Sequence, residues 1–200
     1  MTTTTQRPGG QQSARPTGVE PRPPAESTAG GPARGPVLAI TRVALGLIFL
    51  WAFADKTFGL GYATPADRAW LRGGSPTSGF LAGADIGPFQ AGFRALSGNP
   101  VVDWLFMIGL LGIGVALVLG IALRIAAVTG TVMMVLMWAA EWPPALVDAA
   151  GEPTRSTNPV IDYHLIYALL LITLAVVAAG RFWGLGRTWE RLVGRQRWLV

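Results

Sequence analysis

The chain has 200 residues, of which 51% are hydrophobic and 14% are charged, and its formal net charge is +5. This composition favours one small integral membrane domain over a soluble domain. The arginines lie beside apolar runs rather than in a basic patch among exposed aromatic residues, so nucleic-acid binding is not expected. The sequence holds no cysteine and one histidine, which argues against iron–sulfur, cysteine-zinc and histidine-rich metal sites within the chain. No metal or haem is therefore predicted.

The N-terminal segment, residues 1–36, is rich in Thr, Gly, Pro, Gln, Ser and Arg and has almost no large apolar side chain. Such a segment cannot bury enough apolar surface to offset the conformational entropy lost on folding. The composition therefore predicts a disordered tail.

The first membrane span is predicted at residues 37–56. Arg42 and Asp55 are thirteen residues apart in this span, which is about 20 Å along a helix and less than the ~30 Å hydrocarbon core. One interpretation is that Arg42 snorkels toward the headgroups. The other is that Asp55 and Lys56 point into a polar pocket at the opposite end, because intramembrane charges are costly unless paired or hydrated.

The loop at residues 57–99 is too long to be a simple connector and is expected to cover a cavity. Residues 64–67, Thr-Pro-Ala-Asp, carry an N-cap and an N1 proline, which predicts a short helix through Leu71. A second short helix is predicted from residue 88, with an apolar face formed by Phe89, Phe93 and Leu96.

Two apolar runs, residues 101–123 and 125–142, predict a transmembrane hairpin with its turn at residues 120–124. Three glycines in the first run are expected to permit close helix approach: Gly109, Gly112 and Gly114.

The fourth span is predicted at residues 159–180, after a second outer loop at residues 143–158. Residues 181–200 form a basic amphipathic tail that is expected to rest on an anionic leaflet. Its arginines recur every four residues, at Arg187, Arg191 and Arg195, opposite an apolar face of Trp189, Leu192 and Val193.

Charge sets the predicted orientation. Eleven of the sixteen basic residues fall in the N-terminal tail, at the start of the first span, in the 120–124 turn or in the C-terminal tail. Both termini are therefore expected in the cytoplasm, with an even number of spans. The predicted fold is all-α: a bundle of four transmembrane helices in the cell membrane, with a disordered N-terminal tail and an amphipathic C-terminal helix.

This topology collects polar residues from all four span ends at the outer mouth of the bundle. One interpretation is an ordinary interfacial belt of aromatic and charged residues. The other is a site that binds the head group of a quinone, with His164 and Asp162 handling protons and Lys56 attracting an oxyanion donor. The residues expected to bind the cofactor are Trp104, Trp142, Tyr163, Tyr167, Asp55 and Glu141.

Residues 36–189 resemble the DoxX/DoxD-like family of membrane proteins. The similarity rests on the glycine-rich second span, the arginine-rich tail and a set of single residues: Arg42, Gly46, Phe49, Asp55, Lys56 and Arg124. The family implies a four-helix membrane bundle, and some members are subunits of thiosulfate:quinone oxidoreductase. The resemblance implies the membrane subunit of a quinone-linked oxidoreductase, with thiosulfate as one candidate donor.

The alternative is a scaffold or small-molecule permeation protein without catalytic activity that recruits a redox partner. The lipid bilayer and a redox partner subunit are the expected partners, and self-association is left open.

Overall fold

The computed structural model describes residues 1–4, 33–154, 156–194 and 196. The chain divides into two units, residues 1–31 and 32–200. Most of the predicted disordered tail lies outside the described residues, and Met1–Thr4 have no regular secondary structure. The predicted boundary at residue 36 lies three residues too far along the chain, because the first helix already begins at Arg34.

The regular elements in the described part of the second unit are all helices, and one isolated bridge joins Val147 and Pro153. Three helices are long and apolar enough to cross a membrane: α1 (Arg34–Phe58), α4 (Pro100–Leu119) and α5 (Leu123–Ala140). Helix α6 (Tyr163–Val176) is apolar but has 14 residues, about 21 Å at 1.5 Å per residue. The all-helical prediction is confirmed, and the apolar helices indicate a membrane protein, but the fourth span is shorter than the predicted 159–180.

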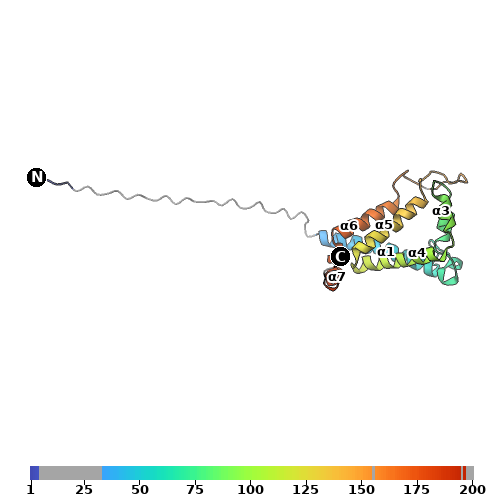
Figure 1. The fold of residues 1–200 in the computed structure, drawn as a ribbon, viewed down its shortest axis with the longest axis horizontal. Coiled ribbons are helices and arrows are strands. Elements are labelled where there is room, and N and C mark those ends of the chain that lie inside the picture. The colour runs from blue at the N-terminus through green and yellow to red at the C-terminus, as the bar shows by residue number, and fades with distance from the viewer. Residues whose placement is uncertain (5–32, 155, 195, 197–200) are drawn as a thin grey trace. The chain divides into compact units, whose positions relative to one another are not determined.

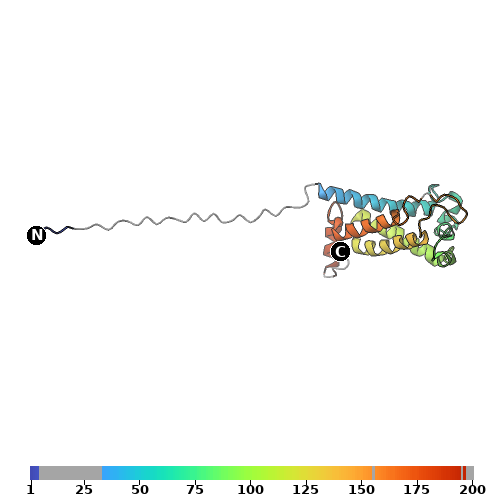
Figure 2. The same ribbon diagram turned by 90° about the horizontal axis from the view of Figure 1, so that it is seen from above.

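The four helices pack as two pairs, α1 on α4 and α5 on α6, and the α4–α5 contact joins the pairs (Figures 1 and 2). The core draws on all four helices, with Leu45, Phe49, Met107, Leu110, Leu117, Met134, Leu171 and Leu174 among its members. At Gly46 an added Cβ would lie 2.9 Å from the Leu117 Cβ, and at Gly114 it would lie 2.7 Å from the Leu50 Cγ. Glycine therefore permits the close α1–α4 approach at these positions. The same expectation is wrong for Gly112, because a Cβ there would meet nothing within 4 Å.

The hairpin between α4 and α5 turns where the sequence predicted. Gly120 ends α4 in the left-handed region at φ +73°, and Ala122 precedes α5 at φ +49°. A left-handed alanine is uncommon because its Cβ crowds the backbone. Arg124 lies in the first turn of α5.

Arg42 does not snorkel; the side chain is buried at 0% exposure. Its Nη1 donates to the carbonyls of Leu117 and Val118, the latter at 2.9 Å. Its Nη2 donates to the carbonyls of Phe182 and Trp183 at 3.3 and 3.2 Å. The last carbonyls of a helix lack intrahelical partners, and the multiple donors of the guanidinium satisfy two of them here while also binding the segment after α6.

The outer loop contains two 3₁₀ turns, η1 (Ala66–Arg68) and η2 (Trp70–Arg72), followed by α2 (Ser78–Ala82) and α3 (Gln90–Ala95). The predicted helix through Leu71 is wrong, because Ala69 is extended at ψ 140° and buried, which separates the two turns. Helix α3 confirms the second predicted helix. Its flanking residues Phe89 and Leu96 are exposed.

Candidate functional site

The first turn of α6 is organised by Asp162. Its Oδ1 accepts a hydrogen bond from the Leu165 N–H at 3.2 Å, which makes Asp162 the N-cap of the helix. Its Oδ2 lies 2.6 Å from the Nδ1 of His164. One carboxylate therefore both starts the helix and orients the imidazole.

His164 is buried at 1% exposure between carboxylates from two helices. Its Nδ1 also lies 3.7 Å from the Oε2 of Glu141, the residue that ends α5. Its Nε2 is buried and has no hydrogen-bond partner among the described residues.

Glu141 is the solvent-accessible member of this group, with its side chain 46% exposed. Partial burial raises the pKa of the Glu141 carboxyl, His164 opposes the rise, and Asp162 adds to it. This carboxyl therefore holds its proton at a higher pH than an ordinary glutamate, within contact distance of a buried imidazole.

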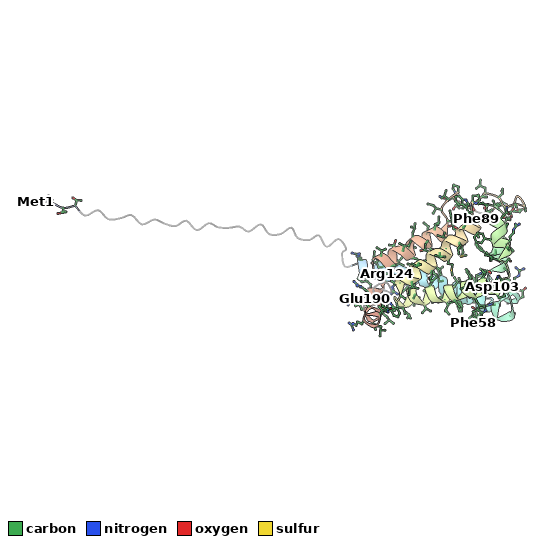
Figure 3. The ribbon with its side chains drawn as sticks, viewed as in Figure 1. Met1, Phe58, Phe89, Asp103, Arg124 and Glu190 are labelled. Atoms are coloured by element: carbon green, nitrogen blue, oxygen red, sulfur yellow. The ribbon has the colours of Figure 1, made fainter. Side chains whose placement is uncertain are left out.

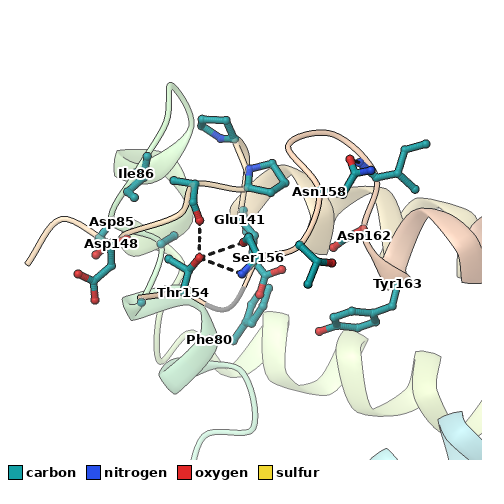
Figure 4. A pocket seen from close by; sticks show the side chains of 18 of the residues that line it. Phe80, Asp85, Ile86, Glu141, Asp148, Thr154, Ser156, Asn158, Asp162 and Tyr163 are labelled. Atoms are coloured by element: carbon teal, nitrogen blue, oxygen red, sulfur yellow. Dashed lines mark hydrogen bonds between the residues drawn. The ribbon is translucent and has the colours of Figure 1, made fainter. Parts of the chain in front are cut away.

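A cavity of about 810 Å³ opens beside these residues, between α2, the end of α5, the 143–158 loop and the start of α6 (Figure 4). Its volume falls in the range of small-molecule sites, roughly 300–1,000 Å³. Its described lining carries no lysine or arginine. Four carboxylates line it: Asp85, Glu141, Asp148 and Asp162.

Two of these carboxylates hold the walls of the cavity together. The Asp85 Oδ2 accepts from the Ala149 N–H at 3.1 Å and so joins the two outer loops. The Asp148 Oδ1 accepts from the N–H groups of Ala150 and Glu152 at 2.9 and 2.8 Å. The side chains of Glu141 and Asp162 are instead the ones that face His164.

Two aromatic rings lie near the histidine. The Tyr163 ring centroid lies 4.0 Å from that of His164, and the Phe80 centroid lies 6.4 Å away with its ring edge-on. Phe80 and Tyr163 both line the cavity, as does Ile166 one turn along α6. Tyr167 packs against the core and is not part of the described lining.

Asp55 is engaged in local structure rather than in the cavity. It is buried, and its two oxygens accept from the N–H groups of Tyr62 and Ala63 at 3.2 and 3.0 Å. The carboxylate fixes the chain just after α1 ends. The second interpretation, in which Asp55 points into a pocket, is therefore not what the structure shows.

Asp103 holds the outer loop in a similar way. Its Oδ1 accepts from the Ser75 hydroxyl at 2.9 Å, from the Thr77 N–H at 3.1 Å and from the Thr77 hydroxyl at 2.6 Å. The first turn of α4 thereby anchors the segment that leads into α2, the helix that carries Phe80 to the cavity.

Three further predicted site residues lie away from the described lining of the cavity. The Nζ of Lys56 lies 5.8 Å from the centroid of the Phe106 ring. Trp104 contacts Trp70 edge-on at 4.6 Å, and Trp142 contacts Trp138 at the same distance. Of the nine predicted site residues, three line the cavity: Glu141, Asp162 and Tyr163. A fourth, His164, is buried behind them and contacts Glu141 and Asp162.

Several lining residues were missed by sequence reasoning, among them Phe80, Asp85 and Asp148. All three come from the two outer loops. The length of the 57–99 loop was a signal that it covers a cavity, but no pattern in it indicated which side chains turn inward.

Three of the residues around the histidine, itself included, could together bind a metal ion. One ligand atom each from Glu141, Asp162 and His164 lies within 4.8 Å of the others. Carboxylate and imidazole donors suit divalent ions such as Mn²⁺, Fe²⁺ or Zn²⁺. The expectation that no metal binds stays a prediction.

The fold and the site define a helical membrane protein with an acidic cavity at one end of the bundle and a buried histidine behind its wall. The chain matches no family model, no curated protein and no solved structure. The resemblance to the DoxX/DoxD-like family therefore stays a prediction.

Proposed function

We propose that this protein is the membrane subunit of a quinone-linked oxidoreductase and binds the ring of a quinol in the acidic cavity. The observation that carries the proposal is the buried His164, whose Nδ1 lies 2.6 Å from Asp162 and 3.7 Å from Glu141, two residues that line the cavity. An imidazole in contact with two carboxylates can transfer protons.

The cavity residues fit such a ring. The volume of about 810 Å³ accommodates it, and Phe80 and Tyr163 supply aromatic walls. The carboxylates of Glu141 and Asp162 accept hydrogen bonds from ring hydroxyls. When bound, a quinone or quinol supplies two-electron, two-proton chemistry.

The protein's own residues would handle the protons. Asp162 holds the imidazole in one orientation through the 2.6 Å contact, and Glu141 lies on the solvent side of the same imidazole. Burial raises the pKa of the Glu141 carboxyl, and its partly exposed side chain lets this carboxyl exchange protons with the aqueous side.

The charges of the cavity argue against thiosulfate as its ligand. The described lining has four carboxylates and no cation, and an oxyanion would be repelled. Lys56, the predicted oxyanion guide, lies against Phe106. We therefore place the electron donor on a partner subunit, since the sequence has no cysteine to relay electrons.

We further propose four spans in the cell membrane with both termini cytoplasmic. Helix α6 is short, but the chain continues through η3 (Ala179–Arg181) at the same end of the bundle as Gly120. Arg124 and Glu190 lie at that end (Figure 3). The start of α1, which carries Arg34, and α7, which carries Arg187 and Arg191, lie there too (Figure 1). Positive charge marks the cytoplasmic side.

The alternative scaffold function has one observation in its favour. The two residues that flank α3 have exposed apolar side chains, Phe89 at 55% and Leu96 at 41%. Such a surface fits a partner protein. The scaffold function needs no ligand in the cavity, so a measurement of ligand binding distinguishes the two proposals.

The test is bound quinone, measured by mass spectrometry on protein extracted into native-membrane nanodiscs. The variants are His164→Ala and Asp162→Asn, and Asp67→Asn is the matched control because Asp67 is an exposed acid on η1. Stoichiometric quinone in the wild type and the control, lost in both site variants, supports the proposal. Quinone at the lipid background in all four proteins overturns it and leaves the scaffold function.

A further inference from the structure

A second concave surface lies at the opposite end of the bundle from the acidic cavity. It has a volume of about 420 Å³ and is lined by Arg181, Arg187, Glu190 and Arg191. Arg181 ends η3, and the other three residues belong to α7 (Gly186–Val193). The surface is therefore built by the segment that follows the last apolar helix.

The surface carries an excess of positive charge. The Arg181 Nε donates to the Glu190 Oε1 at 2.6 Å, so one arginine is neutralised within the surface. Arg187 and Arg191 are exposed and form no ion pair with the described residues. They are four residues apart on α7, hence on one face of the helix.

Apolar side chains are exposed beside these arginines. Leu185 is 52% exposed and Leu192 is 76% exposed. The two leucines are seven residues apart and lie on one side of the helix, about 100–160° around from the arginines at 100° per residue. Trp183 adds a third exposed apolar side chain at 71%. This division of one short helix into basic and apolar faces is typical of helices that lie in a lipid interface.

The start of α7 is hydrogen-bonded to the end of α4, at the turn of the transmembrane hairpin. The Leu185 N–H donates to the carbonyl of Leu119, the last residue of α4, at 2.8 Å. Arg42 holds Phe182 and Trp183 through their carbonyls. Because α4 is long enough to cross the bilayer, its last residue lies at the membrane boundary, and α7 begins at that level.

We propose that Arg181, Arg187 and Arg191 bind the phosphate of an anionic phospholipid headgroup while Leu185 and Leu192 insert at the acyl boundary. The occupant is a bilayer lipid rather than free phosphate, because exposed leucines flank the arginines and a soluble anion would not cover them. A guanidinium pair makes charge-assisted hydrogen bonds to phosphate oxygens. This inference is independent of the quinol proposal, since it concerns the other end of the bundle.

The experiment counts retained lipid by native mass spectrometry after purification of the full chain from membranes that contain phosphatidylglycerol and phosphatidylcholine. The test protein is the double variant Arg187→Gln/Arg191→Gln. The control is Arg68→Gln/Arg72→Gln, which removes the same charge from exposed residues of η1 and η2. We expect the test variant to lose about tenfold or more in phosphatidylglycerol affinity, with the control unchanged.

Two further variants separate charge from lipid. The variant Arg187→Lys/Arg191→Lys keeps the charge and should retain most of the lipid. Leu192→Gln keeps both arginines and should weaken retention. Equal loss in the test and control variants overturns the proposal. Full competition by inorganic phosphate together with an unaffected Leu192→Gln also overturns it, because the site would then serve a soluble anion.

Discussion

The Nη1 of Arg42, on α1, donates to the carbonyl of Val118 in the last turn of α4 at 2.9 Å. Replacing Arg42 with Met keeps much of the apolar stem but removes the guanidinium donors from the carbonyls that Arg42 binds. We expect a loss of about 1–3 kcal/mol in the free energy of unfolding, and a smaller loss for Arg42→Lys. Thermal unfolding in detergent measures both. Arg34→Met, an exposed change on the same helix, should have little effect, and an equal loss there would contradict the explanation.

The second prediction concerns two glycines of α4 that are two residues apart. An added Cβ at Gly114 would lie 2.7 Å from the Leu50 side chain, whereas at Gly112 it would meet nothing within 4 Å. We therefore expect Gly114→Ala to destabilise the α1–α4 pair by roughly 1–3 kcal/mol. Gly112→Ala should be neutral or stabilising by up to about 1 kcal/mol, because alanine has the higher helix propensity. Identical shifts in unfolding temperature would show that the packing contrast is not real.

The third prediction concerns the docking of the outer loop on Asp103. Thr77 binds this carboxylate through both its N–H and its hydroxyl. Asp103→Asn and Thr77→Val should each raise hydrogen exchange across residues 73–82. The double variant should be less affected than the sum of the singles, with a coupling energy of about 0.5–3 kcal/mol. Strict additivity would mean that the two side chains do not act together.

The fourth prediction is a pH dependence that comes from Glu141. Burial raises its pKa above the ordinary value of 4.5, so the folded protein binds this proton more tightly than the unfolded chain. The bound proton on Glu141 therefore adds to the free energy of unfolding. This contribution is complete below pH 4.5 and is lost as pH rises through the raised pKa.

Unfolding temperatures measured from acidic to neutral pH in wild type and Glu141→Gln test this pH dependence. The variant should lose less stability over the range. The control Asp67→Asn should follow the wild type, because Asp67 is exposed and away from the cavity.

Much of the helical framework could be predicted from the sequence, because it depends on local composition. Apolar runs predicted the membrane helices, and Gly120 marked the end of α4. The polar start of α6 indicated Asp162 and His164, which the structure brings within 2.6 Å.

Tertiary contacts account for what the sequence could not predict. Nothing near Arg42 in the chain indicates that its partners lie at Leu117 and Trp183. The inward positions of Phe80 and Asp85 depend on the path of a loop anchored at Asp103. Lys56 was predicted at the same outer mouth, but its Nζ lies over the Phe106 ring instead.

The hydrogen bond from the Ala149 N–H to Asp85 has a consequence for how a ligand reaches the cavity. It ties together two loops that are far apart in the sequence, so entry from the aqueous side would require the loops to separate as a unit. The opposite rim is formed by Tyr163 and Ile166, exposed side chains of an apolar helix. We expect a ligand dissolved in the lipid to enter past these two apolar side chains, a route that would favour hydrophobic molecules.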